Sequence, residues 1–148
     1  MMNFEIPEEL RLMQNTIRRF VNEKILPISL QIENTDEIPE SLVEDIKKMG
    51  LFGMSIPEEY GGLGMNTLGE CLVYEEISRG NASIRTRFST NTGIGSLGIL
   101  YDGTEEQKRK YLPDIASGEK TVAFALTETD AGSDASAIKT TAERREVG

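Results

Sequence analysis

The sequence predicts a mainly helical domain that ends in one strand. Apolar residues recur every three or four positions over most of the chain, and residues that start or stop helices flank these stretches. The period changes over 121–126 (TVAFAL), where branched and aromatic residues alternate with small ones, as in a strand. Because one strand is not a sheet, it implies partner strands beyond Gly148.

The first predicted element is a long amphipathic helix. Pro7 suits a first helical turn, where its missing N–H has no bond to lose, and Glu8 and Glu9 favour the positive end of the helix dipole. Pro27 is expected to kink or divide the helix. The stripe that would face the core consists of Leu10, Met13, Ile17, Phe20, Val21, Ile25, Ile28 and Ile32.

A short second helix is predicted from Pro39 to Gly50, a residue that suits a helix end. The stretch 50–66 then has too many glycines for a regular element, but its apolar residues predict an ordered loop packed on the body. The inward-facing residues would be Leu42, Val43, Ile46 and Met49 in the helix and Leu51, Phe52, Met54, Ile56 and Leu63 in the loop.

Two further helical stretches are predicted, over 68–77 and 82–101. The interior of the second reads STNTGIGSLG. Small residues permit close approach, so this stretch is either a place of tight helix packing or a wall that faces a ligand. In the first stretch, Cys71 is interpreted as a small core residue, and Glu75 and Glu76 as part of a solvated face.

Thr104 and Gln107 form the capping box TEEQ, which predicts the start of the last helix. That helix tolerates a bend at Pro113 and is expected to end at Gly118. The predicted strand follows directly.

Composition excludes several kinds of chemistry. The 148 residues include no His and one Cys, so there is no imidazole for a Ser-His-Asp triad and no internal disulfide. The net charge of −9 has the wrong sign for binding a nucleic acid backbone. No apolar run is long enough for a membrane span, and the amino terminus lacks a secretory signal, so we expect a cytoplasmic protein.

The turn after the strand is the best candidate site. Strand ends and the turns that follow them present backbone N–H groups, and Thr127 and Ser133 add a hydroxyl at each end of this turn, suited to an anionic or electron-rich ligand. The alternative is that Thr127 pairs locally and that Asp130 and Gly132 only form a turn.

The segment FALTETDAGSD resembles the first signature of the acyl-CoA dehydrogenase family, whose usual form is aromatic-x-Leu/Val-Thr-Glu-Pro-x-Ala-Gly-Ser-Asp. IPEEYGGLG, EEISRGNAS and YDGTEEQKRKYLPDIASGE occur in the family's order, so the similarity covers essentially the whole chain. Two positions depart from the usual form: Thr129 replaces Pro, and Asp130 stands where Gly or Asn is common. An added carboxylate near a pyrophosphate is unfavourable unless it points away.

This resemblance implies a fold and an activity. Residues 1–120 would form the family's amino-terminal helical domain, and 121–148 would begin its middle β domain. The implied reaction is α,β-dehydrogenation of an acyl-CoA thioester with FAD as cofactor. The glutamate that acts as base would lie beyond Gly148, so we expect no catalytic residue in this chain. We also expect no metal ligand.

The resemblance also implies which residues hold the cofactor and the substrate. Phe124, Leu126 and Thr127 would lie along the isoalloxazine ring of FAD. Gly132 and Ser133 would lie near its pyrophosphate, and Ser133 would also contact the acyl-CoA. Hydrogen-bond donors directed at the ring would stabilise the charge that develops as hydride arrives.

A second stretch, RGNASIRTRFSTN, resembles the glutaryl-CoA dehydrogenase branch. There, an arginine at the position of Arg85 pairs with the free carboxylate at the far end of the acyl chain, which the planar guanidinium suits. The alternative is a solvated basic face formed by Arg85 and Arg87. Residues two apart on a helix point to different sides, so only one of them can enter a pocket.

The implied partners are the acyl-CoA substrate, an electron-transfer flavoprotein and, in the full-length form, further copies of the same chain, in fatty acid metabolism. The isolated chain would be inactive. Two alternatives stay open. One is a stand-alone helical binding or dimerisation module that keeps TETDAGSD as a relic turn, and the other is a flavoprotein of the same fold with different chemistry, such as an acyl-CoA desulfinase.

Overall fold

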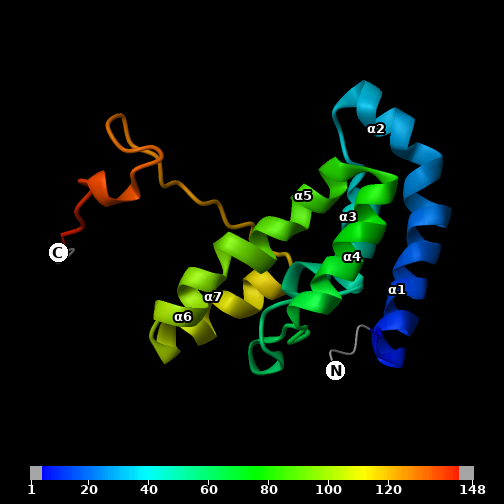
Figure 1. Cartoon of the computed structure of the whole chain (residues 1–148), viewed down its shortest axis with the longest axis horizontal. Coiled ribbons are helices and arrows are strands. Elements are labelled where there is room, and N and C mark those ends of the chain that lie inside the picture. The colour runs from blue at the N-terminus through cyan, green and yellow to red at the C-terminus, as the bar shows by residue number, and fades with distance from the viewer. Residues whose placement is uncertain (1–4, 144–148) are drawn as a thin grey trace.

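Helices dominate residues 5–143, which are the residues that the computed structural model describes. The α-helices are α1 (Glu8–Phe20), α2 (Ser29–Thr35), α3 (Glu40–Lys48), α4 (Thr67–Gly80), α5 (Ala82–Thr90), α6 (Leu97–Asp102) and α7 (Glu105–Ala116). Figure 1 shows them gathered in one body from which the C-terminal segment leads away. The mainly helical fold class is therefore confirmed, whereas 1–4 and 144–148, the outer ends of the two predicted domains, lie outside the described residues.

The predicted long first helix is present and is interrupted around Pro27. After α1 the chain passes through a π-helical turn (Val21–Ile25) and a 3-10 turn (Leu26–Ile28) before α2 begins. Pro27 lies in the 3-10 turn, where its missing N–H breaks the α-helical hydrogen-bond ladder. Of the predicted stripe, Ile17, Val21, Ile25 and Ile32 are buried, and Met13, Phe20 and Ile28 pack against the core.

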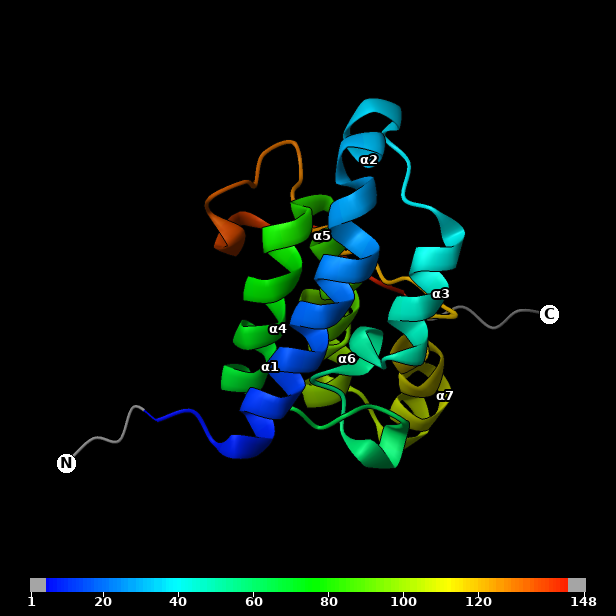
Figure 2. The ribbon, with the colours of Figure 1, turned by 90° about the vertical axis from the view of Figure 1, so that its right-hand side faces the viewer.

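The main core lies where α1 packs on α4 and α4 packs on α5 (Figure 2). A smaller cluster joins α7 to the loop around Tyr60. Side chains with no exposed surface in these two clusters include Ile46, Phe52, Met54, Ile56, Val73, Ile77, Ile84, Phe88 and Leu112. Between residues 5 and 143, none of the helices combines the length and the apolar character needed to cross a bilayer.

The glycine-rich loop 50–66 is ordered, as predicted. The Met65 N–H donates to the Met54 carbonyl at 2.7 Å, and the Leu63 N–H donates to the Gly53 carbonyl at 2.9 Å. Two short 3-10 turns, Leu51–Gly53 and Glu58–Tyr60, lie within it. The predicted inward residues Leu51, Phe52, Met54 and Ile56 are buried, whereas Leu63 stays 43% exposed.

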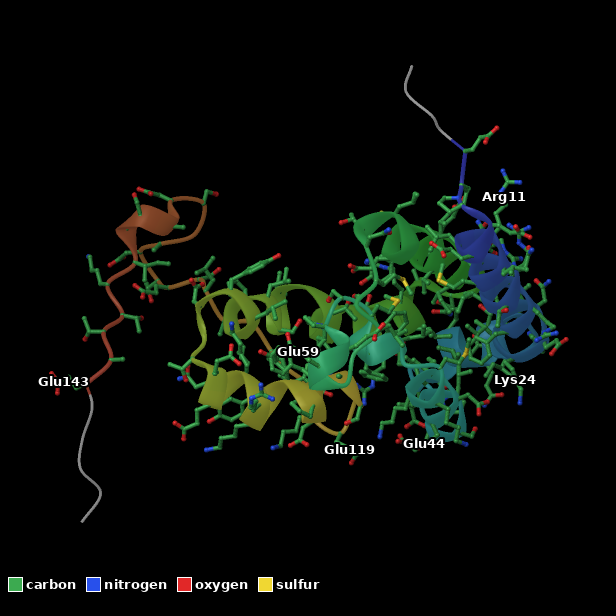
Figure 3. The ribbon with its side chains drawn as sticks, turned by 90° about the horizontal axis from the view of Figure 1, so that it is seen from below. Arg11, Lys24, Glu44, Glu59, Glu119 and Glu143 are labelled. Carbon is green, nitrogen blue, oxygen red and sulfur yellow. The ribbon has the colours of Figure 1, made fainter. Side chains whose placement is uncertain are left out.

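The capping box at the start of α7 is confirmed. The Gln107 N–H donates to the Thr104 hydroxyl at 3.2 Å, and the Thr104 N–H donates to the Gln107 side chain at 2.8 Å. Pro113 lies inside α7, as predicted. The end of this helix is tied to α3 because Lys47 pairs with both Glu44 (3.0 Å) and Glu119 (3.6 Å), the two glutamates that Figure 3 shows along the same side of the molecule.

Two interpretations of α4 are wrong for the same reason. Cys71 is exposed instead of lying in the core, and Glu76 is only 2% exposed instead of lying on a solvated face. The stripe predicted through Cys71 is rotated by about one position from the true buried face. That face consists of Gly69, Leu72, Val73, Glu76 and Ile77.

The strand predicted over 121–126 is not formed. The segment has no strand assignment, and the isolated bridge described after it pairs Glu128 with Ala131. A strand needs a neighbour that shares its ladder of hydrogen bonds, and residues 5–143 contain no second strand to supply one. The segment instead runs away from the helices without regular structure (Figure 1).

Candidate functional site

A pocket of about 260 Å³ opens between α4, α5 and the π-helical turn that follows α5 (Asn91–Gly95). Arg85 and Ser89 are four residues apart and therefore share one face of α5. Within STNTGIGSLG, Gly93 lines the pocket, whereas Gly95 lies tightly against Val122, which is not in a helix; that this stretch faces a ligand stays a prediction. The pocket is lined by Tyr74, Arg85, Ser89, Thr90, Gly93 and Ile94.

A column of aromatic rings fixes Arg85 at this pocket. Its guanidinium carbon lies 5.6 Å from the centroid of the Tyr74 ring, which stacks on Phe88 at a centroid distance of 6.1 Å. Phe88 meets Phe52 edge to face at 6.2 Å, and the guanidinium carbon of Arg87 lies 5.6 Å from the Phe52 centroid. The two arginines therefore lie at opposite ends of the column, and only Arg85 reaches the pocket.

The positive charge of Arg85 has no acid partner among residues 5–143. Other arginines of the body do have one: Arg18 and Arg79 pair with Glu76, and Arg109 pairs with Glu105. A guanidinium always carries its charge and presents five N–H donors in a plane. Arg85 therefore gives the pocket a partly buried cation that is available to an anionic ligand.

Tyr74 joins the pocket to the turn after α5. Its hydroxyl lies 2.6 Å from the hydroxyl of Thr92, which itself donates to the Ser89 carbonyl at 3.1 Å. Burial raises the pKa of Tyr74, although the Thr92 bond and the charge of Arg85 oppose this shift. The ring is thus a neutral, apolar surface beneath Arg85 at physiological pH.

The residues expected to contact a flavin lie on the separate segment 121–127. Phe124 is 57% exposed and Leu126 is 44% exposed. Thr127 is also exposed, and its hydroxyl has no partner among residues 5–143. The alternative in which Thr127 pairs locally is therefore not observed.

The turn beyond this segment is closed by Glu128. Its backbone N–H donates to the Ala131 carbonyl at 3.0 Å, and its carboxylate accepts the N–H groups of Lys139 (2.9 Å) and Thr140 (2.8 Å). The carboxylate also accepts the Thr140 hydroxyl. This hydroxyl bond, together with the two backbone bonds, lowers the pKa of Glu128. The carboxylate thus joins the two ends of the loop.

Gly132 and Ser133 are exposed inside the loop that Glu128 closes. A Cβ added at Gly132 would have open space on all sides to 4 Å. Asp130, which departs from the usual family form, faces the ammonium of Lys139 at 3.7 Å. The carboxylate is therefore partly neutralised by a neighbour on the same loop.

The pocket and the turn are not brought together by any contact among the described residues. The arginine that reaches toward the segment is Arg87, whose guanidinium donates to the Thr121 hydroxyl at 3.2 Å. Figure 3 shows the segment leading away from the helices toward Glu143. The sequence pattern did not predict that Ser89 and Tyr74 line the pocket with Arg85. Ser89 lies four residues after Arg85, so helical spacing could have indicated it, but no sequence signal indicates Tyr74.

Comparison with known proteins identifies relatives along most of the chain. The family profile described as "Acyl-CoA dehydrogenase, N-terminal domain" matches residues 7–119. The "Acyl-CoA dehydrogenase" of Bacillus subtilis (strain 168) is 41% identical over 140 residues, which cover 95% of this chain and 37% of that protein.

Two solved structures share the fold. One is the glutaryl-coenzyme A dehydrogenase glutaryl-CoA complex, with a TM-score of 0.83 and 40% identity over 93% of this chain and 35% of that one. The other is the acyl-CoA dehydrogenase complexed with FAD from Bacillus anthracis, with a TM-score of 0.79 and 37% identity over 94% of this chain and 24% of that one. The chain spans between 24% and 37% of the length of these relatives. It belongs to the acyl-CoA dehydrogenase family.

Proposed function

We propose that this chain forms the acyl-side wall and the first flavin-contacting segment of an enzyme that introduces a double bond between the α and β carbons of an acyl-CoA thioester. Family membership supports the reaction class. The observation that carries the proposal is the pocket in which Arg85, without an acid partner among residues 5–143, lies over the Tyr74 ring. An apolar floor with one cation above it suits an acyl chain with an anionic end.

The segment 121–127 fits FAD. Phe124 and Leu126 leave apolar surface uncovered, and the Thr127 hydroxyl, unpartnered among residues 5–143, follows them, which suits a flat ring with a polar edge. When bound, FAD would supply the hydride acceptor. Phe124 and Leu126 would exclude water from one face of the ring, and Thr127 would donate toward its polar edge. Gly132 and Ser133 would lie beside the pyrophosphate, with Ser133 also reaching the acyl-CoA.

The substrate class we propose is an acyl-CoA with an acidic tail, such as glutaryl-CoA. The relative solved as a glutaryl-CoA complex supports this choice. Arg85 would bind the tail carboxylate through two parallel hydrogen bonds, while Tyr74 and Ile94 would contact the chain. Ser89 and Thr90 provide further hydroxyls at the same wall.

The chain would perform only part of the reaction. We propose that residues 1–120 act as the helical domain, that 121–148 begin a β domain, and that the α-proton is removed by a base that is none of the carboxylates in this chain. Electrons would leave to an electron-transfer flavoprotein, and the full-length protein would assemble from several copies. This chain alone would then be inactive.

The experiment compares Arg85→Gln with wild type in the full-length protein. With glutaryl-CoA, we expect kcat/KM to fall about 10- to 100-fold, because a charge-assisted hydrogen bond contributes about 1.5–3 kcal/mol. With pentanoyl-CoA, which has the same chain length but no second carboxylate, kcat/KM should change less than about twofold. An equal loss on both thioesters would contradict the role of Arg85, and turnover of a sulfinate-bearing acyl-CoA in their place would favour desulfination.

A further inference from the structure

One buried side chain fixes the point where the segment 121–127 leaves the helices. Asn91 has no exposed surface. Its side-chain oxygen accepts the Val122 N–H at 3.1 Å, and its side-chain nitrogen donates to the carbonyls of Lys120 (2.8 Å) and Ile115 (3.0 Å). Both amide hydrogens are therefore used. Together, these three hydrogen bonds join the end of α7 and the start of the segment to Asn91 in the π-helical turn.

The same turn also holds the segment by close packing. A Cβ added at Gly95 would lie 2.7 Å from the Cβ of Val122 and 2.6 Å from the Thr90 carbonyl oxygen. Contacts that short do not occur between real Cβ atoms and their neighbours. Only glycine therefore allows the start of the segment to lie this close to the turn.

Thr92, the residue after Asn91, connects the π-helical turn to Tyr74 of the pocket. The Thr92 hydroxyl bonds to Tyr74 at 2.6 Å, and its carbonyl accepts the Ser55 hydroxyl. Asn91 and Thr92 are both buried and adjacent in the chain. Consecutive residues of one turn thus contact the start of the segment and the ring beneath Arg85.

We propose that Asn91 is a positioning residue that sets where the segment with Phe124, Leu126 and Thr127 lies relative to the Arg85 pocket. This role rests on the proposed function, in which the segment meets the flavin and the pocket holds the acyl chain. Hydride transfer needs the reacting atoms at about 3–3.5 Å, and a displacement of about 1 Å can cost about 100-fold in rate. A buried, fully bonded amide defines such a distance better than an exposed contact does.

The test measures position directly. Nitroxide labels are placed on Cys71, which is exposed on α4, and on an introduced Ala123→Cys, at an exposed position next to Val122. Electron–electron double resonance on the 148-residue chain then gives the distribution of distances between the labels. We expect one narrow distribution in the otherwise unchanged chain. Asn91→Ala should broaden or shift it, and exchange of the Val122 N–H should become about tenfold faster or more.

Matched controls separate positioning from general loss of stability. Asn81→Ala removes another buried asparagine, whose partners are Ser29, Glu33 and Ser83, and should leave the distribution unchanged. Gly95→Ala should displace the segment by steric pressure alone, and it serves if Asn91→Ala does not fold. Gly98→Ala, whose Cβ would meet nothing within 4 Å, is its control.

The outcomes distinguish this proposal from the proposed function. A distribution that is broad before any substitution, or that Asn91→Ala and Gly95→Ala leave unchanged, would overturn the role of Asn91. An equal change in the control variants would also overturn it. FAD titration of the full-length protein is a separate measurement, and absence of FAD binding would contradict the proposed function while the label distances still decide whether Asn91 positions the segment.

Discussion

Glu76 shows how much one residue can depart from its expected surroundings. It lies on the buried face of α4, yet it keeps its charge because Arg18 donates to it at 2.5 Å and Arg79 donates at 3.3 Å. Gln14 is the third residue that donates to this carboxylate, at 3.3 Å. The hydrogen bond from Arg18 lowers the pKa of the carboxyl more than burial raises it. Because Arg18 and Gln14 are on α1, this carboxylate joins α1 to α4.

We expect Glu76→Gln to lower the free energy of unfolding by about 1–3 kcal/mol at neutral pH, because it removes the charge that these donors face. Urea unfolding measures the change, and Glu75→Gln is the matched control. Glu75 is exposed on the same helix, so its substitution should stay within about 0.5 kcal/mol of wild type. Equal effects of the two substitutions would refute the link between α1 and α4.

The same carboxylate predicts the direction of a pH dependence. The pKa of Glu76 is lower in the folded chain than the usual value for a glutamate, chiefly because Arg18 donates a hydrogen bond to it. Its stabilisation is therefore fully present above that value and is lost as the pH falls through the lower folded pKa. The difference in unfolding free energy between wild type and Glu76→Gln should shrink as the pH falls below about 4.3, the usual pKa of a glutamate.

At the scale of elements, local signals predicted most helices correctly. The apolar stripe of α1, the capping box at Thr104 and the break around Pro27 depend on residues near in sequence, and all three are present. The π-helical turns and the rotated face of α4 depend instead on contacts between distant segments. The residues near Cys71 in the sequence do not indicate that α1 packs on the neighbouring face of α4, which leaves Cys71 exposed.

The end of α7 offers a test of packing at a helix terminus. Gly118 has a φ of +78°, and a Cβ there would lie 2.8 Å from the Phe52 ring. Gly61 has a similar φ of +84° but nothing within 4 Å of such a Cβ. Both alanine variants share the backbone strain, so Gly118→Ala should cost about 1–3 kcal/mol more than Gly61→Ala, the penalty for overpacking. Thermal or urea unfolding of the pair checks this, and equal costs would show that the Phe52 contact yields freely.

At the scale of the whole molecule, the sequence identified the candidate residues but not their arrangement. The spacing of Arg85 and Arg87 predicted that only one of them enters a pocket; Arg85 lines the cavity beside Tyr74, Arg87 lies over Phe52, and the binding role of Arg85 stays a prediction. The expected flavin contacts at Phe124, Leu126 and Thr127 stay predictions, since a flavin and partner strands would have to cover them. The burial of Asn91 was not predicted, because a polar residue in a stretch of small residues is ordinarily expected to be exposed.

The proposed function is tested most directly by anaerobic titration of the full-length protein, as purified, with a saturated acyl-CoA, observed through the visible absorbance of bound flavin. We predict that FAD co-purifies with the protein and that its absorbance bleaches as the thioester is oxidised, with glutaryl-CoA effective at lower concentration than pentanoyl-CoA. A protein that holds no flavin, or whose flavin absorbance stays unchanged with every acyl-CoA tested, would contradict the proposal that this chain is part of an acyl-CoA dehydrogenating enzyme.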